Sequence, residues 1–143
     1  MAALRQRVHS AGAVVVRRQE EQLRVLIVRR RRQRDWVLPK GRVQSREGSK
    51  QAARRETWEE SRVRCDGARR LLDVSWRDGR RRPRHIRYWL FEPIEEEKFR
   101  PTGEVSEVAW VDPAEAGRLL AAERDRLALD AALESATVSP AEA

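Results

Sequence analysis

The stretch from Pro39 to Val63 places a glycine turn directly ahead of a helix that carries three crowded glutamates. Glu56, Glu59 and Glu60 have the i, i+3, i+4 spacing that puts side chains on one helix face. Like charges in this arrangement repel, so helix stability alone would disfavour it. A hard cation such as Mg²⁺ binds oxygen ligands and is usually shared with substrate phosphates. The pattern therefore predicts a metal site for a phosphate compound, in preference to a solvated acidic face.

The spacing of the residues in this stretch resembles the Nudix box of the Nudix hydrolases. The matching positions are Gly41, Glu47, Arg55, Glu56, Glu59, Glu60 and Val63. The segments AGAVVV and WVLPKG before the helix, and EVSEVAWV after it, are also similar to that family. The resemblance implies an α/β fold in which a mixed, curved β-sheet lies between α-helices. It also implies a Mg²⁺-dependent hydrolase, with Mn²⁺ able to substitute, that cleaves a phosphoanhydride bond.

Three positions depart from the family pattern. Arg62 stands where the family usually has Gly, Thr57 where an aliphatic residue is usual, and Arg46 where Gly is common. We expect Arg62 to change the exit from the helix, because Gly adopts a left-handed cap at little cost. None of the three removes a proposed metal ligand.

The resemblance assigns metal ligands to named residues. Glu56 and Glu60 are expected to hold the main ion, and Glu59 to complete a second site or bridge through water. The backbone carbonyl of Lys40 matches a further ligand position. Two histidines and one cysteine leave no zinc or thiolate cage as an alternative.

The resemblance also implies a general base. Glu104 best matches the family's glutamate in the loop before the last strand, with Glu107 as the alternative and Glu59 as the base if neither serves. Glu47 is expected to be a secondary ligand or to orient Arg55, which otherwise pairs with Glu59 at i, i+4.

Substrate contacts are expected ahead of the box, where an arginine run leads into the glycine turn. Guanidinium groups suit phosphate oxygens, and the candidates in this run are Arg30, Arg32 and Arg34. Lys40 is the stronger candidate for a phosphate because the turn holds it, and Gly41 allows close backbone approach. Tyr88 is a candidate for stacking on the substrate, although a core position is the favoured interpretation.

The elements follow from hydrophobic patterning. Strands are expected over 10–18 and 23–29, which form a hairpin, and over 71–76, 84–91 and 108–111; the segment 92–104 is expected to be a charged loop. Ser49 is expected to cap a helix over 50–62, and Asp112 to begin the first of two outer helices over 114–120 and 124–133. We expect one Nudix domain over 1–143, with 1–7 and 135–143 loosely held.

The composition restricts which classes of partner the protein is expected to bind. The formal net charge is +8, almost all from arginine, which favours a polyanionic partner; an arginine-rich proteome would explain the overall charge equally well. We expect a small-molecule polyphosphate, with nucleic acid as the weaker alternative. With no apolar run for a membrane and no signal segment, a cytoplasmic monomer or homodimer is expected.

The identity of the substrate stays open between several classes. By resemblance it is a nucleoside diphosphate linked to another group, most simply a diadenosine polyphosphate or another nucleoside polyphosphate. The arginine content also suits inositol pyrophosphates, and 8-oxo-dGTP is a further alternative; ADP-ribose is less favoured. A non-catalytic module that binds a nucleotide or RNA on the same fold is the alternative from another class.

Overall fold

The computed structural model describes residues 9–137, with side chains to 135. The strands are β1 (Ser10–Gln19), β2 (Gln22–Arg30), β3 (Trp36–Val37), β4 (Lys40–Arg42), β5 (Val63–Arg77), β6 (Pro83–Glu96) and β7 (Val105–Val111). The helices are α1 (Ser49–Ser61), α2 (Pro113–Leu119) and α3 (Glu123–Thr137). Helix α3 thus continues past the expected start of the loose tail at 135. Within the described residues, no helix has the length and apolar character needed to cross a bilayer.

The strands form one mixed sheet in the order β3-β2-β1-β6-β5, with β4 also pairing with β1 and β7 with β2. Strands β1 and β6 run parallel, whereas the other pairs are antiparallel. The expected hairpin of β1 and β2 is confirmed, with Gln19 opposite Gln22. Its two turn residues, Glu20 and Glu21, both have positive φ, at 51° and 67°.

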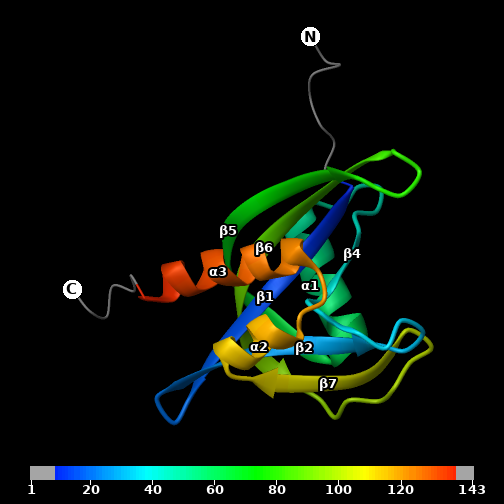
Figure 1. Cartoon of the computed structure of the whole chain (residues 1–143). Helices are drawn as coiled ribbons and strands as arrows, with labels where there is room; N and C mark the ends of the chain where they lie inside the picture. Colours follow the sequence, from blue (N-terminus) through cyan, green and yellow to red (C-terminus); the bar gives the residue numbers. More distant parts are fainter. Residues whose placement is uncertain (1–8, 138–143) are drawn as a thin grey trace.

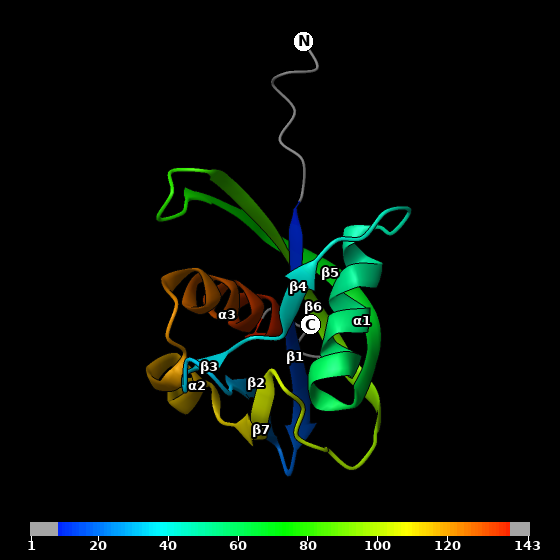
Figure 2. The same ribbon diagram turned by 90° about the vertical axis from the view of Figure 1, so that its right-hand side faces the viewer.

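Helices cover both faces of the sheet, as the expected fold class requires (Figures 1 and 2). Successive side chains along a strand point to opposite faces of the sheet, so β1 contributes residues to two hydrophobic cores. Ala13 and Val15 pack with Ala52 and Ala53 of α1, whereas Val14 packs on the opposite face with residues of α2 and α3. Small alanines on both α1 and β1 let the helix that carries the glutamates lie close to the sheet.

Strands β5 and β6 are longer than their apolar patterns predict. Strand β5 begins at Val63, directly after α1, and pairs there with Glu96 of β6. The expectation of a loop over all of 92–104 is therefore wrong for its first part. Charged side chains on the exposed faces hide the alternation in this segment, and backbone hydrogen bonding between the two strands is what extends them. The resulting ribbon projects beyond the rest of the sheet (Figure 2).

Candidate active site

Helix α1 begins one residue earlier than expected. Its N-cap is Gly48, and the Oε1 atom of Gln51 accepts a hydrogen bond of 3.1 Å from the Gly48 N–H. The expected cap, Ser49, is instead the first helical residue. Its hydroxyl accepts a hydrogen bond of 3.2 Å from the Trp89 indole N–H, which ties the start of the helix to β6.

The other end of α1 shows the effect of the unusual Arg62. This residue is the C-cap and has φ 63° and ψ 28°, the left-handed conformation that Gly adopts more easily. The side chains of Arg62 and Arg64 lie over the Trp58 ring, 5.0 and 3.9 Å from its centroid. Trp58 thus packs against cationic side chains on the face away from the glutamates. Arg46 likewise has a positive φ, of 63°.

Arg55 is the hub of the acidic cluster. Its Nε atom donates to Glu47 at 2.8 Å, and its Nη1 atom donates to Glu56 at 2.8 Å and to Glu59 at 3.0 Å. Nη2 also reaches the carbonyl of Arg42 at 2.9 Å. Both expected pairings, with Glu47 and with Glu59, are therefore present together. The guanidinium beside Glu47 lowers the pKa of that carboxyl, so Arg55 offsets much of the repulsion between the glutamates.

Glu60 lies outside the reach of Arg55 in a more buried position. Burial first, and then the adjacent Glu56 carboxyl, raise the pKa of Glu60, while the charge of Lys40 acts in the opposite direction. Two carboxyls in contact at a half-buried position favour a shared proton or a bound cation. The chemistry of this donor pair fits a hard divalent ion, which takes oxygen ligands.

The residues from 9 to 137 do not, however, contain three or more His, Cys, Asp or Glu side chains already gathered as a metal site. The exposed carboxylate of Glu59 pairs with Arg55. The three glutamates of the predicted cluster therefore have different environments. Glu56 contacts both the Glu60 carboxyl and the Arg55 guanidinium, whereas Glu59 pairs with Arg55 on the exposed side.

Gly41 brings the turn against the face of α1 that carries Glu56. A Cβ atom at this position would overlap the carboxylate of Glu56. The residue before it, Lys40, is held by pairing of β4 with β1, in which Lys40 lies opposite Gly12. The glycine is thus required for the close approach of backbone and carboxylate, independently of its φ angle.

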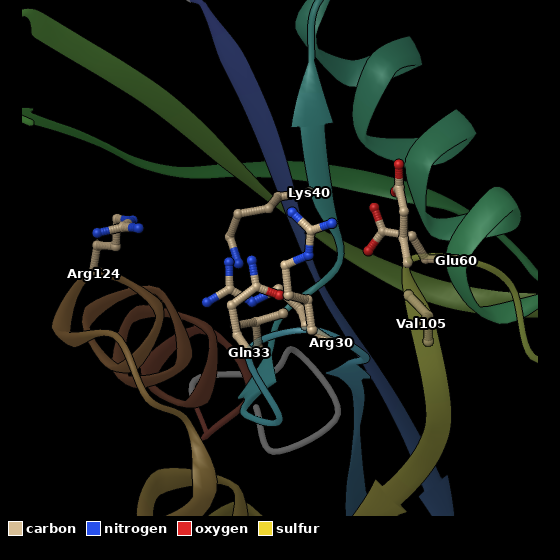
Figure 3. Close-up of a pocket in the computed structure, with 10 residues that line it drawn as sticks. Arg30, Gln33, Lys40, Glu60, Val105 and Arg124 are labelled. Carbon is tan, nitrogen blue, oxygen red and sulfur yellow. The ribbon is translucent and has the colours of Figure 1, made fainter.

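A cavity of about 460 Å³ opens between α1 and α3 (Figure 3). It is lined by Arg30, Arg32, Gln33, Val37, Lys40, Glu60, Gly103, Glu104, Val105 and Arg124. In Figure 3, Glu60 lies on one side and Arg124 on the other, with Arg30 and Lys40 between them. The cavity is therefore acidic at the end near α1 and basic elsewhere.

The arginine run contributes less than predicted. Arg30 and Arg32 line the cavity, but Arg34 does not; its backbone N–H closes a turn onto the Arg30 carbonyl at 2.9 Å. The Arg30 guanidinium forms a two-pronged pair with Asp35, at 2.8 and 2.6 Å. Arg30 is thus oriented by a neighbour, and Arg34 is not supported as a phosphate contact.

Of the three candidates for the general base, the structure separates the first two, and Glu59 pairs with Arg55 at 3.0 Å. Glu104 lines the cavity together with Glu60. Glu107 instead lies on β7 and forms an exposed ion pair of 3.1 Å with Arg29 of β2. Of these two glutamates, Glu104 is therefore the one that faces the cavity.

Tyr88 does not lie at the cavity surface. Its side chain is fully buried, and its hydroxyl donates to Asp125 Oδ1 at 2.5 Å. Burial and the Asp125 carboxylate raise the pKa of Tyr88 well above its usual value. The prediction that Tyr88 stacks on a substrate does not fit this position, because both ring faces are covered by the core.

Asp125 is a site residue that the sequence did not predict. It belongs to α3 and is fully buried. Its Oδ2 atom accepts from the Lys40 Nζ at 2.9 Å and from the Leu38 N–H at 3.1 Å. The lysine predicted to bind phosphate is thus already paired with a carboxylate from a helix 85 positions away. The local signal was weak, since Asp125 looks like an ordinary charge in the first turn of a helix.

Comparison with known proteins agrees with the resemblance found in the sequence. The chain matches the family model described as NUDIX domain over residues 7–132. It belongs to this family and is therefore an enzyme of the Nudix hydrolase class. Members of the family generally use divalent metal ions.

Solved structures share the fold at low identity. A C. elegans Ap4A hydrolase, in a binary complex, superposes with a TM-score of 0.73 and 22% identity, over 87% of this chain and 94% of that one. The Nudix domain of Shewanella oneidensis NrtR, complexed with ADP ribose, has a TM-score of 0.75 and 22% identity, over 93% and 90%. A MutT Nudix hydrolase from Burkholderia pseudomallei has a TM-score of 0.72 and 23% identity, over 87% and 98%.

Proposed function

We propose that this protein is a Mg²⁺-dependent hydrolase that cleaves a phosphoanhydride bond in a nucleoside diphosphate linked to a further group. The preferred substrate is a diadenosine polyphosphate or another nucleoside polyphosphate. The observation that carries the proposal is the divided charge of the cavity, with Glu60 and Glu104 on one side and Arg30, Arg32, Lys40 and Arg124 around the rest.

This arrangement suits a long anion that is held at one end and cleaved at the other. Carboxylates alone would repel phosphate, so the acidic end needs a cation to be part of a phosphate site. Glu56 and Glu60 are the proposed ligands, with the Lys40 carbonyl as a further one. A divalent ion bound there would neutralise phosphoryl oxygens and lower the pKa of water.

The chain's own residues supply the remaining parts of the reaction. Glu104 is placed to accept a proton from the attacking water. Lys40 and the cavity arginines bind the phosphates that are not attacked. Arg55 keeps Glu47 and Glu56 in place and leaves Glu60 as the carboxyl that faces the cavity.

Glu60→Gln tests the metal site. The substitution keeps size and removes the charge, so we expect Mg²⁺-dependent hydrolysis to fall by orders of magnitude while the circular dichroism spectrum is unchanged.

Glu104→Gln should lower kcat by about 10²- to 10⁴-fold, the usual contribution of a general base. Glu107→Gln is the matched control on the neighbouring strand and should retain activity. Unchanged turnover in Glu60→Gln would contradict the mechanism, and a stable fold without any hydrolysis by the wild type would favour a binding module.

A substrate panel identifies the compound and the attacked phosphorus. Diadenosine polyphosphates, 8-oxo-dGTP, ADP-ribose and diphosphoinositol polyphosphates are compared with Mg²⁺ and with Mn²⁺ in ¹⁸O-labelled water. We expect the highest kcat/KM for a diadenosine polyphosphate, with one ¹⁸O atom in a single product. Highest activity on a diphosphoinositol polyphosphate would reject the nucleotide and keep the hydrolase.

A further inference from the structure

A second cavity, of about 230 Å³, adjoins the first on the side away from α1. Its wall includes Trp76 of β5 and Arg84, His85 and Ile86 of β6. It shares Lys40 and Arg124 with the first cavity. These two cations therefore mark the junction between the two cavities.

Arg124 is held at this junction but lacks an anionic partner. Its guanidinium lies over the Trp76 ring, 4.3 Å from the centroid. Its Nε atom is buried and has no hydrogen-bond acceptor among the described residues. A buried donor without an acceptor is costly, so the position favours an anion that supplies one.

A second arginine shows that stacking alone does not explain this state. Arg17 also has a buried Nε without a partner and lies over a tryptophan, Trp110, at 4.0 Å. Its Nη1 atom, however, is neutralised by Glu96 at 3.0 Å. No ion pair of Arg124 with a carboxylate is present in the part of the chain that the structure describes. Arg124 thus keeps its charge available at a cavity wall.

The second cavity combines this charge with flat and apolar surface. Trp76, the His85 ring and Ile86 form one part of the wall. His85 is fixed there by a contact of 2.9 Å between its Nε2 atom and Asp73. Cationic groups at the mouth and rings inside suit a ligand that joins a phosphate to an aromatic base.

We propose that Lys40 and Arg124 bind a phosphate at the junction, and that the second cavity holds the base of the nucleoside attached to that phosphate. The inference rests on the proposed function and extends it, because two adjoining cavities suit a substrate with a nucleoside at each end. One end lies near Glu60, and the other lies beside Trp76.

Binding without divalent ions tests the inference separately from hydrolysis. AMP and ribose 5-phosphate, which has an anomeric hydroxyl where AMP carries adenine, are titrated by calorimetry into the full chain. We expect AMP to bind about tenfold more tightly, because stacking of a base on an aromatic side chain has roughly this effect. Trp76→Leu should remove the preference for AMP and leave the affinity for ribose 5-phosphate unchanged. Arg124→Gln should weaken both ligands.

Controls address folding and net charge. Arg80→Gln removes one positive charge from the exposed end of the β5–β6 ribbon and should change neither affinity. Trp76→Phe replaces Trp76→Leu if the latter does not fold, and it should lower the preference for AMP. The same variant assigns the Trp76 indole NMR signal, because that signal disappears from its spectrum. In the wild type this signal should shift with AMP and not with ribose 5-phosphate. A preference for AMP that survives at Trp76→Leu, an indole signal that AMP does not move, or unchanged affinities in Arg124→Gln would overturn the inference.

The catalytic variant keeps the two proposals apart. Glu60→Gln should lose hydrolysis and still prefer AMP over ribose 5-phosphate. Intact base selection in a wild-type protein that hydrolyses no nucleotide would contradict the proposed function alone. Hydrolysis of a diadenosine polyphosphate with a KM that Trp76→Leu does not change would contradict the second-cavity inference alone.

Discussion

At the scale of single residues, neighbouring glutamates have opposite environments. Glu59 and Glu60 are adjacent in sequence, and one step along a helix turns the side chain by about 100°. Glu59 therefore points to Arg55 and solvent, whereas Glu60 lines the cavity. Burial at this position raises the pKa of Glu60, and the difference in environment is why we assign the two residues different importance.

Asp73 has a pKa shift in the opposite direction, and this shift makes the stability of the protein fall at low pH. Asp73 accepts from Arg87 Nε at 2.9 Å and from Arg70 at 3.1 Å. Hydrogen bonding from Arg87 is the main reason that the pKa of Asp73 falls to about 2. A folded-state pKa below the unfolded value adds stability that is present above the unfolded pKa and is lost as pH falls through the folded one.

The predicted effect is a difference in acid sensitivity between two variants. Between about pH 4 and pH 2, Asp73 should account for roughly 2 kcal/mol of the loss in free energy of unfolding. Asp73→Asn should remove this part, so its stability should change less over the same range in urea denaturation. Asp66→Asn, at an exposed position on the same strand, is the control. Equal pH dependence of wild type and Asp73→Asn would show that the ion pairs do not persist in solution.

At the scale of elements, helix α1 combines a functional face with poorly adapted ends. It has no side-chain cap at Gly48, and it ends at Arg62 in the left-handed conformation that costs an ordinary residue about 1–2 kcal/mol. Tertiary contacts therefore hold the helix more than its own ends do. They include Ala52 and Ala53 against the sheet and Arg55 against the Glu47 loop.

Replacing Arg62 by Gly tests this interpretation. We expect the free energy of unfolding to rise by about 1 kcal/mol, because Gly adopts positive φ without strain. Loss of the 5.0 Å contact with Trp58 should be minor, since Arg64 lies closer to the ring. Arg62→Ala is the matched control, because it removes the same side chain and keeps the strain. If the two variants have the same midpoint in chemical denaturation, the left-handed cap is not a source of strain.

At the scale of the whole molecule, one buried carboxylate joins three separate parts of the chain. Asp125 of α3 binds the loop at Leu38, the side chain of Lys40 and the hydroxyl of Tyr88 in β6. The C-terminal helix therefore helps to hold the glycine turn that faces Glu56. This connection makes α3 part of the candidate active site as well as an outer layer of the fold.

Asp125→Ala should destabilise the protein by about 3–5 kcal/mol, the usual cost when one partner of a buried ion pair is removed. Tyr88→Phe, which removes a single hydroxyl from the same network, should cost about 1–2 kcal/mol. Urea denaturation at neutral pH measures both values. Similar, small losses for the two variants would show that Lys40 does not depend on Asp125 for its position.

What the sequence determined by itself is local in origin. The hairpin of β1 and β2 and the helix over the box follow from periodicity, and the family resemblance adds the layered fold. The pairings of Arg55 with Glu47 and Glu59 follow from spacing along the chain. Asp112 as a helix cap also follows from local chemistry, and its side chain accepts from the Glu115 N–H at 2.9 Å.

Only the tertiary structure decided which of the candidates meet. Arg34 and Tyr88 were plausible from sequence, yet a turn directs one away from the cavity and the core encloses the other. Asp125 and Arg124 carried only a weak local signal, because their importance comes from Lys40 and Trp76, which lie far from them along the chain. Spacing along one helix predicts which side chains share a face, but contacts between distant segments depend on how the sheet and α3 pack together.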